Sequence, residues 1–118
     1  MVSKSIEISD ELKKMGISTG VVDLFKIKPI SKKIKDMVLK KSKIIFTIEE
    51  SAPNSGIAIS INAEVLKENL RLTVYNFGTE DKQVFDYGDR EWLLARMKLD
   101  NKSIIQAIYN KCKLASYL

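Results

Sequence analysis

The side chains that could carry out chemistry are few in kind in this chain of 118 residues. The chain contains no histidine, which removes the most common general base and the most common zinc ligand together. Its one cysteine, Cys112, lies between two lysines, so neither an internal disulfide nor a metal-ligand spacing is available. No Ser-His or Cys-His pair is therefore possible, and any catalysis would depend on Asp, Glu, Lys or Tyr.

Two adjacent acids, Glu49 and Glu50, are the best placed of these residues. They directly follow a strand predicted at residues 43–48, whose residues are apolar on both faces, as in an inner strand of a parallel sheet. Gly56 then allows a sharp turn at the carboxyl end of that strand, where α/β proteins place ligands or contacts. Plain solvation of the two acids is the favoured interpretation, and the functional alternative is a contact to a partner domain or a tightening of the following turn. No other residue converges there, so neither an acid–base pair nor a stand-alone enzyme using Tyr75 is favoured.

The second notable cluster is basic. The formal net charge is +5, and much of it comes from one stretch at residues 26–43. Its lysines, opposed only by Asp36, are Lys26, Lys28, Lys32, Lys33, Lys35, Lys40, Lys41 and Lys43. Such a surface could bind nucleic acid or an acidic protein. Arginine is scarce there and no exposed aromatic residues interleave with the lysines, so a solvated helix face is the favoured interpretation.

Helices and strands alternate along the chain around these residues. Apolar spacing, the caps Ser31 and Asp89 and the stop at Gly16 predict helices at 3–15, 31–41, 57–69 and 90–98 and a last one beginning after Asp100 or Asn101. The helix at 57–69 is expected to carry Leu66 on its apolar side. The predicted strands lie at 20–25, 43–48 and 70–77. This order predicts a single α/β domain over residues 1–118, with a parallel sheet covered by helices. No apolar run reaches the ~20 residues of a membrane span, and we expect a cytoplasmic protein.

Three segments also carry a family resemblance. The first comprises Gly16-Ile17, Val21-Val22-Asp23-Leu24 and Ile27-Lys28-Pro29-Ile30, and it is similar to a "GI…VIDL..IKPLD" pattern. The second, Ile45-Phe46-Thr47-Ile48-Glu49-Glu50 with Gly56, is similar to "VVTVEE….GG.G". The third runs through Val74, Phe77-Gly78, Phe85, Gly88, Leu93-Leu94, Leu99-Asp100 and Ile104-Ile105, and follows "G…LL…GLD…I". Together they resemble the C-terminal domain of transketolase and its relatives, the pyruvate dehydrogenase beta chains and 1-deoxyxylulose-5-phosphate synthase.

The resemblance implies a three-layer α/β/α fold with a mostly parallel sheet. It implies that other domains hold thiamine diphosphate and its divalent metal, while this domain supports assembly and dimer contacts. No catalytic, cofactor-binding or metal-binding residue is then expected here. The family-motif residues that could form an interface are Lys28, Pro29, Glu49, Glu50, Gly56 and Gly88. Ser31 replaces the family's Asp after "KPL", and Asn54-Ser55-Gly56 replaces paired glycines, which puts a close backbone approach in doubt.

The resemblance also exposes a departure in the sheet. The family domain begins with strands ahead of its first helix, and one of them lies between the strands that correspond to residues 20–25 and 43–48. Here Met1-Val2-Ser3 aligns with the start of the first helix, so the N-terminal strands are lacking. The chain is then a fragment of a longer polypeptide, or its remaining strands pair directly, or another molecule fills the gap.

The sequence thus predicts a non-catalytic part of a transketolase-like, thiamine diphosphate-dependent transferase, inactive by itself. Its expected partners are the remaining domains or a separate subunit of that enzyme, and we expect a homo-oligomer without membrane contact. The alternative is a module that binds protein or nucleic acid through the lysine-rich face at residues 26–43. Sugar ketol transfer, 2-oxoacid oxidation and deoxyxylulose phosphate synthesis share this domain, so the reaction of the parent enzyme stays open.

Overall fold

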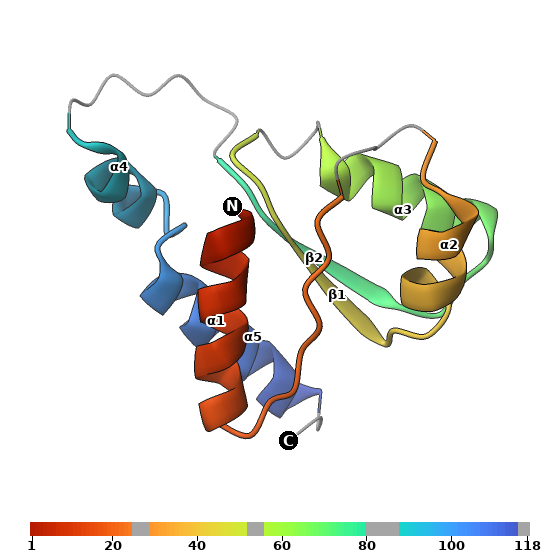
Figure 1. Cartoon of the computed structure of the whole chain (residues 1–118), viewed down its shortest axis with the longest axis horizontal. Coiled ribbons are helices and arrows are strands. Elements are labelled where there is room, and N and C mark those ends of the chain that lie inside the picture. Colours follow the sequence, from red (N-terminus) through yellow and green to blue (C-terminus); the bar gives the residue numbers. More distant parts are fainter. Residues whose placement is uncertain (25–28, 52–55, 80–87, 116–118) are drawn as a thin grey trace. The chain divides into compact units, whose positions relative to one another are not determined.

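The computed structural model describes residues 1–24, 29–51, 56–79 and 88–115 (Figure 1). The chain divides into two compact units. The helical unit comprises Met1–Asp23 and Lys82–Leu118, and the sheet unit comprises Leu24–Asp81. None of the helices in the described ranges has the length and apolar character needed to span a membrane.

The helical unit contains α1 (Val2–Lys14), α4 (Arg90–Arg96) and α5 (Asn101–Leu114), and α1 packs against α5. Its buried core consists of Ile8, Leu12, Ile17, Leu94, Leu99, Ile104, Ile108 and Cys112. Aspartate side chains cap the last two helices, because Asp89 accepts a hydrogen bond from the Trp92 N–H and Asp100 from the Ser103 N–H.

Local hydrogen bonds and a glycine determine where α1 ends. Gly16 has a φ of +88°, a left-handed conformation that glycine adopts without steric cost. The N–H of Ile17 donates to the carbonyl of Leu12, and the N–H of Gly16 donates to that of Lys13. This is the Schellman arrangement, in which Ile17 and Leu12 are both buried. The predicted helix stop at Gly16 is confirmed.

The sheet unit contains α2 (Lys32–Ile34), the π-helical turn η1 (Lys35–Leu39), β1 (Ile44–Ile48), α3 (Ile57–Lys67) and β2 (Thr73–Phe77). The Ser31 side chain caps α2 by accepting a hydrogen bond from the Ile34 N–H at 3.2 Å. The two strands are parallel, and their register pairs Ile44 with Thr73 and Ile48 with Phe77. The crossover between them is α3, as expected for a parallel pair.

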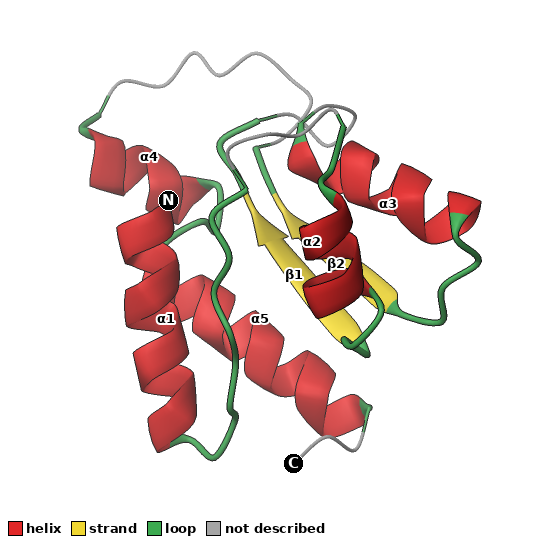
Figure 2. Cartoon of the chain, turned by 45° about the vertical axis from the view of Figure 1, so that its right-hand side comes forward, coloured by secondary structure: helices red, strands yellow, loops and turns green. Residues whose placement is uncertain are grey.

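The side chains of the sheet divide between two faces. On one face, Ile45 and Val74 pack against a buried cluster of Ile30, Leu39 and Ile61. These cluster residues place α2, η1 and α3 over that face, and α2 and α3 lie beside the strands in both views (Figure 2). On the other face, the ring of Phe46 stacks on Tyr75 and Phe77, with centroid distances of 5.5 and 6.0 Å.

The structure confirms the α/β class with a parallel sheet and corrects three local predictions. Residues 20–24 form no strand, and Val21 and Val22 are 38% and 47% exposed. A strand exists only when a neighbour completes its ladder, and β-branched composition does not supply that neighbour. The helix predicted at 31–41 changes to π geometry after Ile34. Leu66 was expected on the apolar side of its helix but is 82% exposed.

Candidate functional site

The carboxyl ends of β1 and β2 form the site that the sequence analysis indicates. The ladder continues beyond the strands, since the Glu49 N–H donates to the Phe77 carbonyl at 2.9 Å. The Thr79 N–H then donates to the Ser51 carbonyl at 3.0 Å. The two segments that leave the sheet therefore stay joined by main-chain hydrogen bonds.

The carboxylate of Glu49 is the central group of this site. It is only 7% exposed. One oxygen accepts a hydrogen bond from the Ile57 N–H at 2.7 Å, and the other accepts one from the Ala58 N–H at 3.2 Å. These amides begin α3, where N–H groups lack intrahelical partners and the helix dipole favours negative charge. Glu49 therefore tightens the turn and caps the helix, and it is not a solvated surface acid.

Gly56 allows the chain to approach this carboxylate closely. Its backbone has a φ of +76° and a ψ of −146°, in a region that is nearly restricted to glycine. A Cβ atom at this position would collide with the carboxylate of Glu49 and would lie 2.7 Å from Ser51 Oγ. The close approach is therefore present with a single glycine, although Asn54 and Ser55 replace the family's glycine pair in the sequence.

Three further residues at this edge, Thr47, Asn76 and Gly78, were not predicted as site residues, although Thr47 and Gly78 belong to the resemblance segments. A Cβ atom on Gly78 would lie 2.7 Å from the Ser51 carbonyl oxygen and 3.0 Å from the Asn76 amide nitrogen. The hydroxyl of Thr47 donates to Asn76 Oδ1 at 2.7 Å. The signal was available, because parallel strands end at one edge and the strand predicted at 70–77 ended in Asn76 and Phe77, directly before Gly78.

Four predicted interface residues remain, which are Lys28, Pro29, Glu50 and Gly88. Lys28 lies outside the described residues, and Pro29 and Glu50 are exposed in the sheet unit. Gly88 belongs to the helical unit, where a Cβ atom would lie 2.8 Å from Cδ2 of the Trp92 ring. The structure thus brings Glu49 and Gly56 together.

At this edge the chain supplies its own anion to the N-terminus of a helix. In α/β proteins the N-terminus of a helix at the carboxyl edge often binds a phosphate group. Here the chain's own carboxylate, that of Glu49, takes the position of such an anion. Within the described residues, no group of three or more His, Cys, Asp or Glu side chains is arranged to hold a metal ion.

Two lysines of the basic stretch bind acids of the same chain. Lys35 Nζ lies 3.0 Å from Glu64 Oε2, and both side chains are largely buried. Lys40 Nζ lies 2.9 Å from Asp36 Oδ1. This hydrogen bond lowers the pKa of Asp36 and raises the pKa of Lys40. The positive charge available to an external nucleic acid or acidic partner is reduced accordingly.

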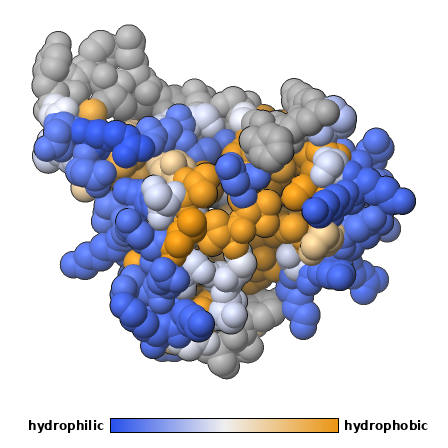
Figure 3. Space-filling view, in the orientation of Figure 1, coloured by the Kyte–Doolittle hydropathy of each residue, from blue (hydrophilic) through white to orange (hydrophobic). Residues whose placement is uncertain are grey.

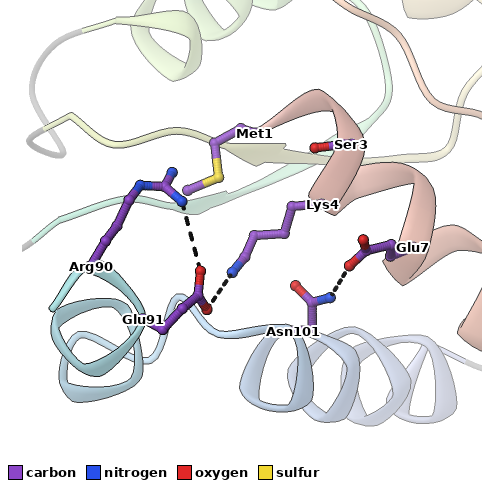
Figure 4. A pocket seen from close by; sticks show the side chains of 7 residues that line it. All are labelled: Met1, Ser3, Lys4, Glu7, Arg90, Glu91 and Asn101. Carbon is purple, nitrogen blue, oxygen red and sulfur yellow. Dashed lines mark hydrogen bonds and ion pairs between the residues drawn. The ribbon is translucent and has the colours of Figure 1, made fainter.

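The helical unit contains a polar pocket of about 450 Å³ (Figure 4). Its lining consists of Met1, Ser3, Lys4, Glu7, Arg90, Glu91 and Asn101. Glu91 lies between two cations, 3.7 Å from Lys4 Nζ and 3.8 Å from Arg90 Nη1. Glu7 accepts a hydrogen bond from the Asn101 amide at 2.8 Å. Acidic and basic side chains thus balance within the lining, which gives the pocket little attraction for an ion of either sign.

Comparison with known proteins identifies the fold and its family. The sequence profile described as "Transketolase, C-terminal domain" matches residues 1–104. The chain belongs to the transketolase C-terminal domain family. The match spans residues of both units, and it confirms the resemblance carried by the three sequence segments.

Several relatives of this transketolase C-terminal domain are 1-deoxy-D-xylulose-5-phosphate synthases. The protein of that name from Chlamydia abortus is 33% identical over 108 residues, which are 92% of this chain and 17% of the relative. The one from Caldanaerobacter subterraneus is 30% identical over 113 residues, 96% of this chain and 18% of the relative. The chain therefore spans less than a fifth of the length of these relatives.

A solved structure shows the same fold. The chain described as "Split gene transketolase, inactive beta4 tetramer" superimposes with a TM-score of 0.77 at 27% identity. The match covers 92% of this transketolase C-terminal domain and 35% of the solved chain.

Proposed function

We propose that this chain is the non-catalytic C-terminal domain of a transketolase-like, thiamine diphosphate-dependent transferase, in which it serves assembly and domain packing. Residues 1–118 act as one portion of a larger cytoplasmic enzyme. The remaining domains or a separate subunit hold thiamine diphosphate, its divalent metal and the reacting atoms. Homo-oligomeric contacts are part of this assembly role.

The observation that carries the proposal is the position of the Glu49 carboxylate. A diphosphate group requires free N–H donors or a positive helix end. The first two amides of α3 are already hydrogen-bonded to Glu49, whose negative charge also opposes a second anion. The carboxyl edge therefore supports packing of the loop on the sheet and does not suit a diphosphate.

The size of the chain relative to its relatives supports the same proposal. It spans 17% of the Chlamydia abortus protein and 35% of the solved split-gene chain. The named relatives include two different enzymes, a synthase and a transketolase. Since the same domain accompanies both, the rest of the enzyme selects the substrate.

Isothermal titration calorimetry of the 118-residue protein with thiamine diphosphate and Mg²⁺ tests the proposal. We expect no saturable heat, and no transfer of a two-carbon ketol unit when donor and acceptor sugars are added. A complete transketolase, titrated under the same conditions, is the positive control. Tight cofactor binding by the 118-residue protein, or turnover of any substrate by it, would overturn the proposal.

A further inference from the structure

The strands of the sheet unit begin at an edge opposite the one that carries Glu49. Strands β1 and β2 are parallel, and their first residues pair in register. Segments η1 and α3 precede these strands in the chain, so their last turns lie toward the same edge. The amino edge surface comprises Leu66 and Lys67 in the last turn of α3, Arg71 before β2 and Lys41 before β1.

The cations of this edge differ in whether an acid of the chain neutralises them. Lys40, at the end of η1, donates a hydrogen bond to Asp36 at 2.9 Å. This hydrogen bond raises the pKa of Lys40, as does the charge of Glu68 after α3. Lys43 also interacts within the chain. Three exposed cations remain at this edge whose side chains form no ion pair or hydrogen bond within the described ranges, namely Lys41, Lys67 and Arg71.

Folding of the sheet unit explains one of these three positions. Lys67 lies in the last turn of α3, where the helix dipole favours a cation. Lys41 and Arg71 lie outside the helices and strands, so no dipole of their own element favours them. Like charges that gather without a counter-charge oppose folding through repulsion. The positive charge of the amino edge surface is therefore better suited to an anionic partner than to the stability of this unit.

A leucine within the amino edge surface indicates which anionic partner fits. Leu66 is 82% exposed and directly precedes Lys67. Side chains over α2 and α3 are mainly hydrophilic in the space-filling view, whereas apolar side chains gather over the strands (Figure 3). A phosphate backbone offers a leucine nothing to pack against, and single-stranded nucleic acids bind through aromatic stacking, which these four residues cannot supply. Protein surfaces combine acidic and apolar side chains.

We propose that the amino edge surface binds an acidic protein surface, with Lys41, Lys67 and Arg71 facing carboxylates and Leu66 packing on an apolar side chain between them. The inference rests on the assembly role proposed above and specifies the chemistry of the partner surface. Opposite charges steer such a partner to this edge, and the leucine contact is shielded from water when the two surfaces meet.

Fluorescence anisotropy with two labelled probes tests the charge and the class of the partner. The first probe is a peptide with a repeating Glu-Glu-Leu unit, and the second is single-stranded DNA of equal charge. We expect the unmodified chain to bind the peptide more tightly than the DNA at low ionic strength. Added salt should weaken peptide binding, because it screens exposed charges.

A triple substitution tests the location of the surface. Lys41→Gln with Lys67→Gln and Arg71→Gln should weaken peptide binding by about tenfold, because all of the unpaired charge of this edge is removed. The matched control is Lys13→Gln with Lys102→Gln and Lys113→Gln. It removes the same charge from exposed lysines of the helical unit, and it should leave most of the affinity.

A single substitution tests the apolar contact. Leu66→Ser should weaken binding of the peptide several-fold and leave the weak binding of DNA unchanged. Leu114→Ser is the control, because Leu114 is 87% exposed in the helical unit and should not affect either probe. If the triple variant does not fold, Arg71→Gln alone and Leu66→Ser still decide the inference.

Three outcomes would overturn the inference. They are no binding of the peptide by the unmodified chain, equal losses in the triple variant and its control, and tighter binding of DNA than of peptide. The outcomes remain separate from those of the calorimetric test. A chain that binds neither the peptide nor thiamine diphosphate overturns this inference alone, and a chain that binds both at these sites overturns only the proposed function.

Discussion

The two units are stabilised in different ways. The largest fully buried side chains of the described residues, Leu12, Leu94, Leu99 and Ile104, all belong to the helical unit. The buried polar side chains, Thr47, Glu49 and Ser60, all belong to the sheet unit. Apolar packing dominates the helical unit, whereas the sheet unit combines its apolar cluster with hydrogen bonds at one end of the sheet. This difference indicates that loss of an apolar side chain should weaken the helical unit most, and loss of a hydrogen bond the sheet unit.

The largest expected effect belongs to the core of the helical unit. Leu99→Ala should destabilise the chain by about 3 kcal/mol, because it removes a fully buried side chain and leaves a cavity. Leu114→Ala is the control, since Leu114 is 87% exposed and its truncation should change the unfolding free energy by less than about 0.5 kcal/mol. Urea denaturation measures both. Similar costs for the two variants would contradict the dependence of the helical unit on its buried apolar core.

An intermediate effect is expected at Glu49, which caps α3 in the sheet unit. Glu49→Gln keeps the shape of the side chain but replaces one accepting oxygen with an NH₂ group that faces an N–H donor. The loss should be about 1–2 kcal/mol, as for a buried hydrogen bond left unmade. Glu50→Gln alters the exposed neighbour and should cost less. Equal losses in urea denaturation would show that the cap contributes nothing specific.

The smallest expected effect concerns two left-handed residues, one in each unit. Lys98 has a φ of +58° at the end of α4, and Asn69 has a φ of +51° after α3. The family pattern "GLD" carries glycine where Lys98 stands. Lys98→Gly should stabilise the chain by about 0.5–1 kcal/mol by relieving the strained backbone. Asn69→Gly should change stability less, because asparagine tolerates this conformation. Thermal unfolding measures both, and a lower melting temperature for Lys98→Gly would contradict the prediction.

Features determined by nearby residues were predictable from the sequence. The caps at Ser31 and Asp89 and the stop at Gly16 depend on groups within a few positions, and all three are confirmed. The strand expected at residues 20–25 depended on a partner strand, which composition does not reveal. The change to π geometry after Ile34 has no signal in the apolar spacing that predicted the helix.

The sequence predicted where the candidate site lies in the fold, but it did not predict the contacts that its residues make. Glu49 and Gly56 were expected at the carboxyl edge, where the structure places them. The hydrogen bonds of Glu49 to Ile57 and Ala58 depend on the path of the intervening loop, which one-dimensional spacing leaves undetermined. Asn76 and Gly78 join the edge only through the strand register. Long-range pairing is therefore the information that the sequence analysis lacked.

The π-helical turn η1 has a consequence for length variation in this family. A π turn accommodates one more residue than the α-helical turn it interrupts. The segment Lys35–Leu39 thus carries a spare residue between Pro29 and β1. Homologues one residue shorter here should have a regular α-helix and an unchanged strand. We therefore expect this turn to absorb the gain or loss of one residue without a change in the register of β1.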